Sequence, residues 1–215
     1  DTILFDLDGT LTDPKIGITT CVQYALSKFG IEEPDLDKLE PFIGPPLLES
    51  FMGFYSFSEE NARLAINYYR ERFSVIGLYE NSVYPGIERM LTELKKSGRT
   101  LLLATSKPTV YSVTILKHFK LYDYFDVIVG SELDGTRTAK SEVIDYAVNQ
   151  LLNYNKENMV MVGDRMHDIV GAFQNHIKSI GVTYGYGSED ELKASKAPYI
   201  VHSVQELKEL LLKMY

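Results

Sequence analysis

Two aspartates, Asp6 and Asp8, stand two residues apart directly after the short apolar run at residues 3–5, and Gly9 follows them. Side chains two residues apart in a strand point the same way, and a turn at the glycine would also let both carboxylates converge. Like charges held close together repel and favour a compensating cation. Carboxylate oxygens are the ligands that hard ions such as Mg²⁺ prefer. The pair therefore predicts a metal-assisted acidic centre.

A second set of polar residues follows later apolar runs: Thr105, Ser106, Lys107, Lys140, Asp164 and Asp168. Ligands of open α/β sheets bind beyond the carboxyl ends of the strands, where such residues would gather. Carboxylates could share one Mg²⁺, while hydroxyl groups and N–H groups at helix starts could bind phosphate oxygens. A lysine offsets the charge of a phosphate or of a nucleophile. One carboxylate would then be free to attack phosphorus, and another to serve the leaving group.

The elements that must position these residues are short apolar runs alternating with helical patterns. Strands are predicted at residues 2–6, 100–105, 126–130, 159–163, 179–182 and 199–201, and one of the intervening helices is predicted over 140–152. Strands that are apolar on both faces and alternate with helices indicate a parallel sheet covered on both sides. The predicted fold class is therefore α/β.

The first predicted strand is separated from the others by a long helical stretch. Residues 14–82 show helical spacing of apolar residues without a convincing strand, and the pattern changes at Tyr84-Pro85-Gly86. We therefore expect a core domain made of residues 1–13 and 83–215 and a helical domain made of residues 14–82.

Composition limits the class of partner. The 215 residues carry a net charge of −8, which argues against nucleic-acid polymers and anionic membranes as ligands. A single cysteine, Cys21, rules out a disulfide within the chain and favours a reducing compartment. No apolar run is long enough to cross a membrane and none resembles a signal peptide, so we expect a cytoplasmic protein. Asp1 is not expected to be the native start.

Four motifs in order resemble those of the haloacid dehalogenase (HAD) superfamily. Residues 6–11 (DLDGTL) resemble its first motif, residues 103–107 (LATSK) its second, Lys140 its third, and residues 162–168 (VGDRMHD) its fourth. The match extends over nearly the whole chain, and residues 14–82 lie where that superfamily carries a helical cap. The resemblance implies a Rossmann-like parallel sheet with a cap inserted after the first strand. Residues 43–47 and 185–187 are most similar to phosphoglycolate phosphatase-like and 5′-nucleotidase-like members.

The resemblance also implies the chemistry. Asp6 would be the nucleophile that forms an aspartyl-phosphate with a phosphate monoester. Asp8 would protonate the leaving alcohol and then deprotonate the attacking water. Thr105, Ser106 and Lys140 would bind and orient the phosphoryl oxygens.

By the same resemblance, one Mg²⁺ would be held by a side-chain oxygen of Asp6, the main-chain carbonyl of Asp8 and the carboxylate of Asp164. Asp168 would support this shell directly or through water. The expected substrate is a small phosphorylated metabolite, with phosphoglycolate and nucleoside 5′-monophosphates as the first candidates. The protein is expected to be a monomer or a homodimer.

Alternatives remain open at this stage. Close phosphatase relatives often carry Pro after the third-motif lysine where this chain has Ser141, so Lys107 is a second candidate for that charge. Asp8 favours a phosphatase or a phosphomutase, because dehalogenases of the superfamily lack this residue and its ATPases usually carry Thr. A phosphomutase of the β-phosphoglucomutase type therefore stays possible, as does a non-catalytic interaction module. The loop at Gly44-Pro45-Pro46 is either a simple helix–helix turn or a part of the cap that touches substrate.

Overall fold

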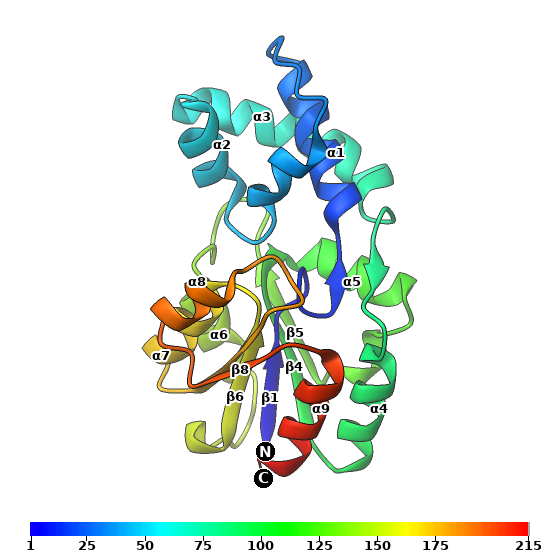
Figure 1. The fold of residues 1–215 in the computed structure, drawn as a ribbon, viewed down its shortest axis with the longest axis vertical. Coiled ribbons are helices and arrows are strands. Elements are labelled where there is room, and N and C mark those ends of the chain that lie inside the picture. Colours follow the sequence, from blue (N-terminus) through cyan, green and yellow to red (C-terminus); the bar gives the residue numbers. More distant parts are fainter. Residues whose placement is uncertain (215) are drawn as a thin grey trace. The chain divides into compact units, whose positions relative to one another are not determined.

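The computed structural model, which describes residues 1–214, contains a six-stranded parallel sheet (Figure 1). The strand order is β5-β4-β1-β6-β7-β8, so β1 lies between β4 and β6. The strands are β1 (Thr2–Phe5), β4 (Thr100–Pro108), β5 (Val127–Ser131), β6 (Met159–Gly163), β7 (Lys178–Val182) and β8 (Tyr199–Val201). Every pairing in this sheet is parallel. The predicted α/β class is confirmed.

Helices cover both faces of the sheet. They are α4 (Ile87–Lys96), α5 (Thr109–His118), α6 (Lys140–Val148), α7 (Met166–Gln174), α8 (Glu189–Ala194) and α9 (Val204–Lys213). Leu4, Leu102 and Met161 belong to one buried cluster with residues of α6 and α7. Their neighbours Ile3 and Phe5 are equally buried and point to the opposite face by strand alternation. Figure 1 shows α4 and α9 side by side, and the two helices are in contact.

Two elements differ from their predicted bounds by more than one residue. β4 continues to Pro108 instead of stopping at residue 105, with a shift in its pairing to β5 after Ala104. Helix α6 ends at Val148, whereas the spacing predicted a helix to residue 152. The N–H groups of residues 150 and 151 bond to carbonyls three residues earlier, and the following Leu152 is 99% exposed. The apolar spacing thus extends past the helix into a tighter turn, in which Leu151 still packs against the core but Leu152 does not.

The chain divides into two compact units, one made of Asp1–Asp13 with the chain from Val83 onward and one made of Pro14–Ser82. The second unit contains α1 (Lys15–Ser27), the 3₁₀ helix η1 (Leu36–Phe42), α2 (Leu47–Tyr55), α3 (Glu59–Arg72) and the π-helical turn η2 (Phe73–Gly77). The two chain segments at the boundaries of these units form a two-stranded sheet of β2 (Thr12–Asp13) and β3 (Ser82–Val83).

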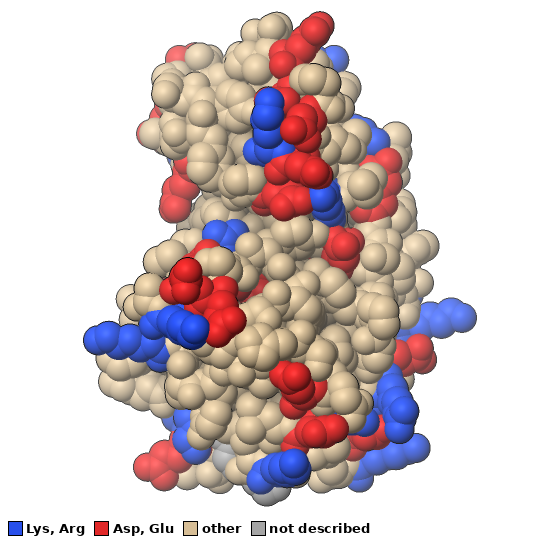
Figure 2. Space-filling view, in the orientation of Figure 1, with Lys and Arg blue, Asp and Glu red and all other residues tan. Residues whose placement is uncertain are grey.

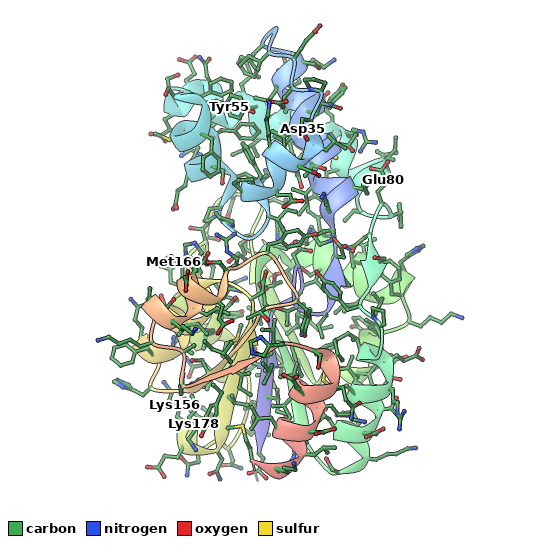
Figure 3. The ribbon with its side chains drawn as sticks, in the orientation of Figure 1. Asp35, Tyr55, Glu80, Lys156, Met166 and Lys178 are labelled. Atoms are coloured by element: carbon green, nitrogen blue, oxygen red, sulfur yellow. The ribbon has the colours of Figure 1, made fainter. Side chains whose placement is uncertain are left out.

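The helical unit has an aromatic cluster around the buried Phe42 and Phe51, with Phe54 on its exposed side. The ring of Phe42 packs edge-on against those of Phe51 and Phe54, at centroid distances of 5.0 and 5.3 Å. Arg72 donates to both carboxylate oxygens of Glu80, at 2.6 and 2.8 Å. Glu80 is labelled in Figure 3. In the part of the chain that the structure describes, no helix combines the length and the apolar character that a membrane span requires.

Candidate active site

The central strands deliver Asp6 and Asp164 to one edge of the sheet. Phe5, the last residue of β1, pairs with Leu103 of β4 and with Val162 of β6. The N–H of Asp6 donates to the carbonyl of Val162 at 2.9 Å, which fixes the backbone where β1 ends. Asp164 follows the end of β6 directly. Because the strands are parallel, these two carboxylates leave the sheet at the same edge.

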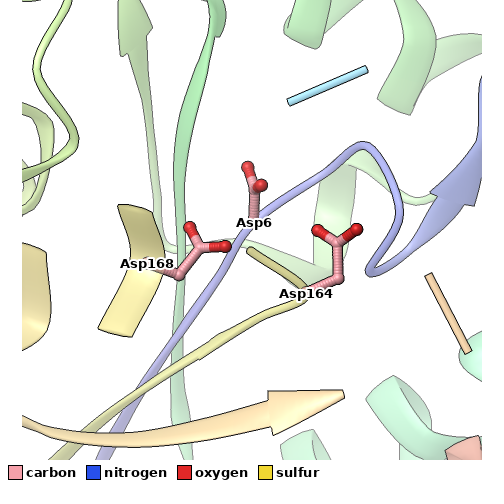
Figure 4. A group of neighbouring side chains, drawn as sticks. All are labelled: Asp6, Asp164 and Asp168. Carbon is pink, nitrogen blue, oxygen red and sulfur yellow. The ribbon is translucent and has the colours of Figure 1, made fainter. Parts of the chain in front are cut away.

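Asp168 joins them from the first turn of α7. One oxygen from each of Asp6, Asp164 and Asp168 lies within 4.8 Å of the others, and all three residues are buried (Figure 4). Asp168 is oriented by a hydrogen bond that its Oδ2 accepts from the N–H of Arg165 at 3.1 Å. Residues from two strand ends and one helix start thus form a single acidic cluster.

Lys140, the first residue of α6, reaches into this cluster. Its Nζ lies 2.9 Å from Oδ1 of Asp6 and 2.8 Å from Oδ1 of Asp168. It also donates to the carbonyl of Ala104, in β4 just before its pairing to β5 shifts, at 3.1 Å. The two carboxylate contacts are ion pairs, because neither Oδ1 accepts a well-aligned hydrogen bond from residues 1–214. Lys140 therefore neutralises part of the charge and fixes the nucleophile candidate from one side.

The electrostatics of the cluster show an excess of negative charge. Burial raises the pKa of Asp164 well above its usual range, and the neighbouring carboxylates of Asp168 and Asp6 raise it further. Burial also raises the pKa of Asp168 to about 6, although Lys140 acts in the opposite direction. Burial alone would lower the pKa of Lys140, but Asp168 and Asp6 raise it. One ammonium group does not balance three buried carboxylates.

Glycines make room for Asp164. A Cβ placed on Gly9, Gly185 or Gly187 would lie 2.2, 2.5 or 1.8 Å, respectively, from the nearest atom of Asp164. The backbone N–H of Tyr186 donates to Oδ2 of Asp164 at 2.7 Å. The Tyr186 hydroxyl in turn donates to Asp13. The loop around Tyr186 therefore encloses the Asp164 side chain and fixes one of its oxygens.

Asp8 lies outside this group of three carboxylates. Its Oδ2 forms an ion pair with Nζ of Lys107 at 2.8 Å, and both side chains are nearly inaccessible to solvent. Burial raises the pKa of Asp8, and Lys107 opposes that shift. Lys107, considered from the sequence as a second candidate for the charge beside the nucleophile, thus contacts Asp8, whereas Lys140 contacts Asp6.

The two hydroxyl residues that were predicted to bind phosphate lie at the end of β4. Thr105 is buried, and its Oγ1 accepts a long hydrogen bond of 3.3 Å from the N–H of Lys107. The carbonyl of Ser106 accepts from the hydroxyl of Ser131 at 2.8 Å, which ties this segment to the end of β5. Both residues are therefore held at the same edge of the sheet as Asp6.

Sequence reasoning gave no structural role to Tyr186 or to its flanking glycines. The only signal was that residues 185–187 resemble one subgroup of the superfamily. Their contact with Asp164 joins segments far apart in the chain, so spacing alone could not have revealed it.

The acidic cluster fits a divalent cation. Oδ1 of Asp164 is buried and accepts no hydrogen bond from residues 1–214. Buried carboxylate oxygens without partners are costly, and hard cations with oxygen ligands satisfy them. The orphaned oxygen of Asp164 and the three converging carboxylates are the donor set that such an ion requires.

The parallel sheet gathers three buried carboxylates and a lysine at its carboxyl edge, and comparison with known proteins gives the family of the chain. The family model described as haloacid dehalogenase-like hydrolase matches residues 3–182. This chain belongs to that family. The predicted superfamily resemblance is confirmed.

Individual relatives agree with this assignment. A protein of Pseudomonas aeruginosa named 5′-nucleotidase is 52% identical over 209 residues, covering 97% of this chain and 94% of the relative. The tyrosine-protein kinase PtkA of Mycobacterium tuberculosis is 38% identical over 213 residues, covering 97% and 72%. The crystal structure of a predicted phosphatase from Clostridium acetobutylicum matches with a TM-score of 0.96 and 54% identity, covering 99% and 98%. The chain is an enzyme of the HAD phosphatase family, whose members hydrolyse phosphate esters.

Proposed function

We propose that this protein is a Mg²⁺-dependent phosphomonoesterase that hydrolyses a small phosphate ester through a phosphorylated Asp6. The observation that carries the proposal is the convergence of Asp6, Asp164 and Asp168, with oxygens within 4.8 Å, where the buried Lys140 contacts Asp6 and Asp168. A buried nucleophile beside a cationic side chain and a cation site suits attack on a phosphate, whose oxygens carry the negative charge.

The residues divide the chemistry as follows. A carboxylate oxygen of Asp6 attacks phosphorus, the bond from phosphorus to the ester oxygen breaks, and Asp8 gives its proton to that oxygen. In the second half, Asp8 takes a proton from water, the water oxygen attacks phosphorus, and the Asp6 carboxylate is released. Lys140 and the Thr105 hydroxyl hold the phosphoryl oxygens between the two halves.

The cation would be held by Asp6 and Asp164, with Asp168 supporting them and the main-chain carbonyl of Asp8 completing the protein ligands. When bound, it would neutralise charge on the phosphate and on the surrounding carboxylates. Oδ2 of Asp164 already accepts from Tyr186, which leaves Oδ1 for the ion.

We propose a nucleoside 5′-monophosphate as the first substrate to test and phosphoglycolate as the second. The first choice rests on the relative named 5′-nucleotidase, and both rest on the resemblance of the sequence motifs. We further propose that residues 14–82 act as a cap that admits substrate and excludes bulk water during the reaction.

Partners and location follow from charge and composition. On the face drawn in Figure 2, Lys and Arg side chains are scattered among acidic ones and form no continuous basic patch. Together with the net charge of −8, this supports a small phosphorylated metabolite as the ligand and argues against a nucleic-acid polymer or an anionic membrane. We propose a cytoplasmic monomer or homodimer.

Phosphate release from a panel of esters, with Mg²⁺ and with EDTA, tests the proposal. Asp6→Asn should lower turnover by at least about a thousandfold, because the nucleophile is lost. Asp123→Asn, an exposed aspartate outside the cluster, is the matched control and should keep full activity. After a short incubation with substrate, acid-quenched wild type should carry phosphate on Asp6 by peptide mass spectrometry.

Three results would contradict the proposal. Full activity of Asp6→Asn would exclude Asp6 as the nucleophile. Conversion of a sugar phosphate to its isomer without free phosphate would indicate the phosphomutase alternative. Transfer of phosphate from ATP to a tyrosine peptide without ester hydrolysis would indicate the activity for which PtkA is named.

A further inference from the structure

The end of β4 is irregular where it carries Lys107. Ala104 pairs with Val129 of β5, but the next pairing joins Pro108 to Ser131, so β4 carries extra residues between them. Bulges of this kind bend a strand and redirect its side chains, and they are common beside active sites. Here the Lys107 side chain reaches Asp8, in the turn that follows the neighbouring strand β1.

The end of β5 fixes this bulge. A Cβ on Gly130 would lie 2.1 Å from the carbonyl oxygen of Lys107, so only glycine lets the two backbones approach this closely. The N–H of Gly130 donates to Oγ1 of Thr109 at 3.0 Å, and the Ser131 hydroxyl donates to the Ser106 carbonyl at 2.8 Å. The backbone on both sides of Lys107 is therefore fastened to β5, and the direction of its side chain is built in.

Lys107 and Asp8 form a buried contact that is separate from the contacts of Lys140. Nζ of Lys107 lies 2.8 Å from Oδ2 of Asp8, with side-chain exposures of 6% and 11%. Oδ1 of Asp8 is buried and accepts no hydrogen bond from residues 1–214. Lys107 thus fixes one oxygen of Asp8, while the other is buried with no hydrogen-bond partner among residues 1–214.

We propose that Lys107 is a positioning residue for the leaving-group step: it holds Oδ2 of Asp8 so that Oδ1 delivers the proton to the ester oxygen. When Oδ1 is protonated, Oδ2 still accepts from the Lys107 ammonium group, so the orientation survives the proton transfer. The proton moves from Oδ1 to the ester oxygen as its bond to phosphorus breaks, and no further reactant is required. This inference rests on the proposed function.

The leaving group provides a test that a merely structural role would not satisfy. 4-Nitrophenolate leaves without a proton at neutral pH, whereas the alcohol of an alkyl phosphate needs one. The value of kcat/KM covers only the steps up to cleavage of the ester bond, so the shared dephosphorylation step does not enter the comparison. The alkyl substrate is a nucleoside 5′-monophosphate or phosphoglycolate, whichever the wild type cleaves faster.

Lys107→Met should lower kcat/KM for the alkyl ester by about a hundredfold and for 4-nitrophenyl phosphate by less than about tenfold. Lys107→Arg, which restores a cation, should recover part of the alkyl-ester activity. Lys178→Met, at the exposed start of β7 on the opposite edge of the sheet, is the matched control and should leave both values unchanged (Figure 3).

A second comparison keeps the test decisive if Lys107→Met does not fold. The double variant Asp8→Asn/Lys107→Met removes both buried charges, so neither is left without its partner. Its kcat/KM for the alkyl ester should equal that of Asp8→Asn, because Lys107 acts only through Asp8. An equal fall for both esters, or a fall of the double variant below Asp8→Asn, would overturn the inference while the proposed function stands. A wild type that cleaves neither ester would overturn both.

Discussion

Gly9 and Asp164 lie so close together that a Cβ on Gly9 would stand 2.2 Å from Oδ2 of Asp164. Gly9 also has a φ of +77°, which side chains rarely adopt. The turn after the first-motif aspartates therefore requires glycine for two reasons, and one of them is the space needed by a carboxylate from the fourth motif.

Gly9→Ala should weaken Mg²⁺ binding by at least about tenfold and destabilise the fold by on the order of 2–4 kcal/mol, because backbone strain and overlap with Asp164 add. Gly98→Ala is the matched control, since Gly98 has a φ of +81° with no atom within 4 Å of the added Cβ. Calorimetric titration with Mg²⁺ and denaturant unfolding measure the two effects. Equal losses in both variants would show that the overlap with Asp164 is unimportant.

Lys140→Met should abolish detectable turnover and destabilise the metal-free protein by about 3–5 kcal/mol, because Asp6 and Asp168 lose their buried partner. Its affinity for Mg²⁺ should be equal to or higher than that of the wild type, since a positive charge 2.9 Å from Asp6 is removed. Calorimetric titration measures the Mg²⁺ affinity, and unfolding curves measure the loss of stability. Weaker Mg²⁺ binding would mean that Lys140 shapes the cation site instead of competing with it.

Stabilisation by Mg²⁺ should increase as the pH rises from about 5 to 7. The pKa of Asp168 is raised from 3.8 to about 6 in the folded protein, so the metal-free fold binds a proton there that the unfolded chain has already lost. The metal-free protein therefore loses stability as the pH rises from 5 to 7, by about 1 kcal/mol from Asp168 alone. Above this pH range, a bound cation compensates the charge of Asp168 in place of the proton. The melting temperature with Mg²⁺ and with EDTA, followed across pH, measures the difference; a constant difference would contradict the assignment.

Tyr186→Phe and Gly187→Ala should separate two functions of the same loop. Tyr186→Phe removes the hydroxyl bond to Asp13 but keeps the backbone bond to Asp164, so it should cost about 1 kcal/mol and leave Mg²⁺ affinity unchanged. Gly187→Ala places a Cβ 1.8 Å from the carbonyl oxygen of Asp164, so it should lower both stability and Mg²⁺ affinity. If Tyr186→Phe alone weakens Mg²⁺ binding, the hydroxyl takes part in orienting Asp164.

Local pattern was sufficient for much of the fold. Alternation of apolar runs and helical spacing gave the six strands of the parallel sheet, because buried strands and amphipathic helices carry distinct periodicities. The prediction was wrong at Leu152, where the apolar spacing continues beyond the end of helix α6. It was also wrong in β4, where the strand continues through the polar residues between Thr105 and Pro108.

The sequence by itself determined which chemical groups are available and at which strand ends they emerge, because Asp6 and Asp164 each follow a short apolar run that predicts a buried strand. Only the tertiary structure decided which groups meet. Lys107 contacts Asp8 and Lys140 contacts Asp6 because β1 lies between β4 and β6 and because a bulge redirects the end of β4. Strand order, register and bulges arise from packing between distant segments, which no local spacing encodes.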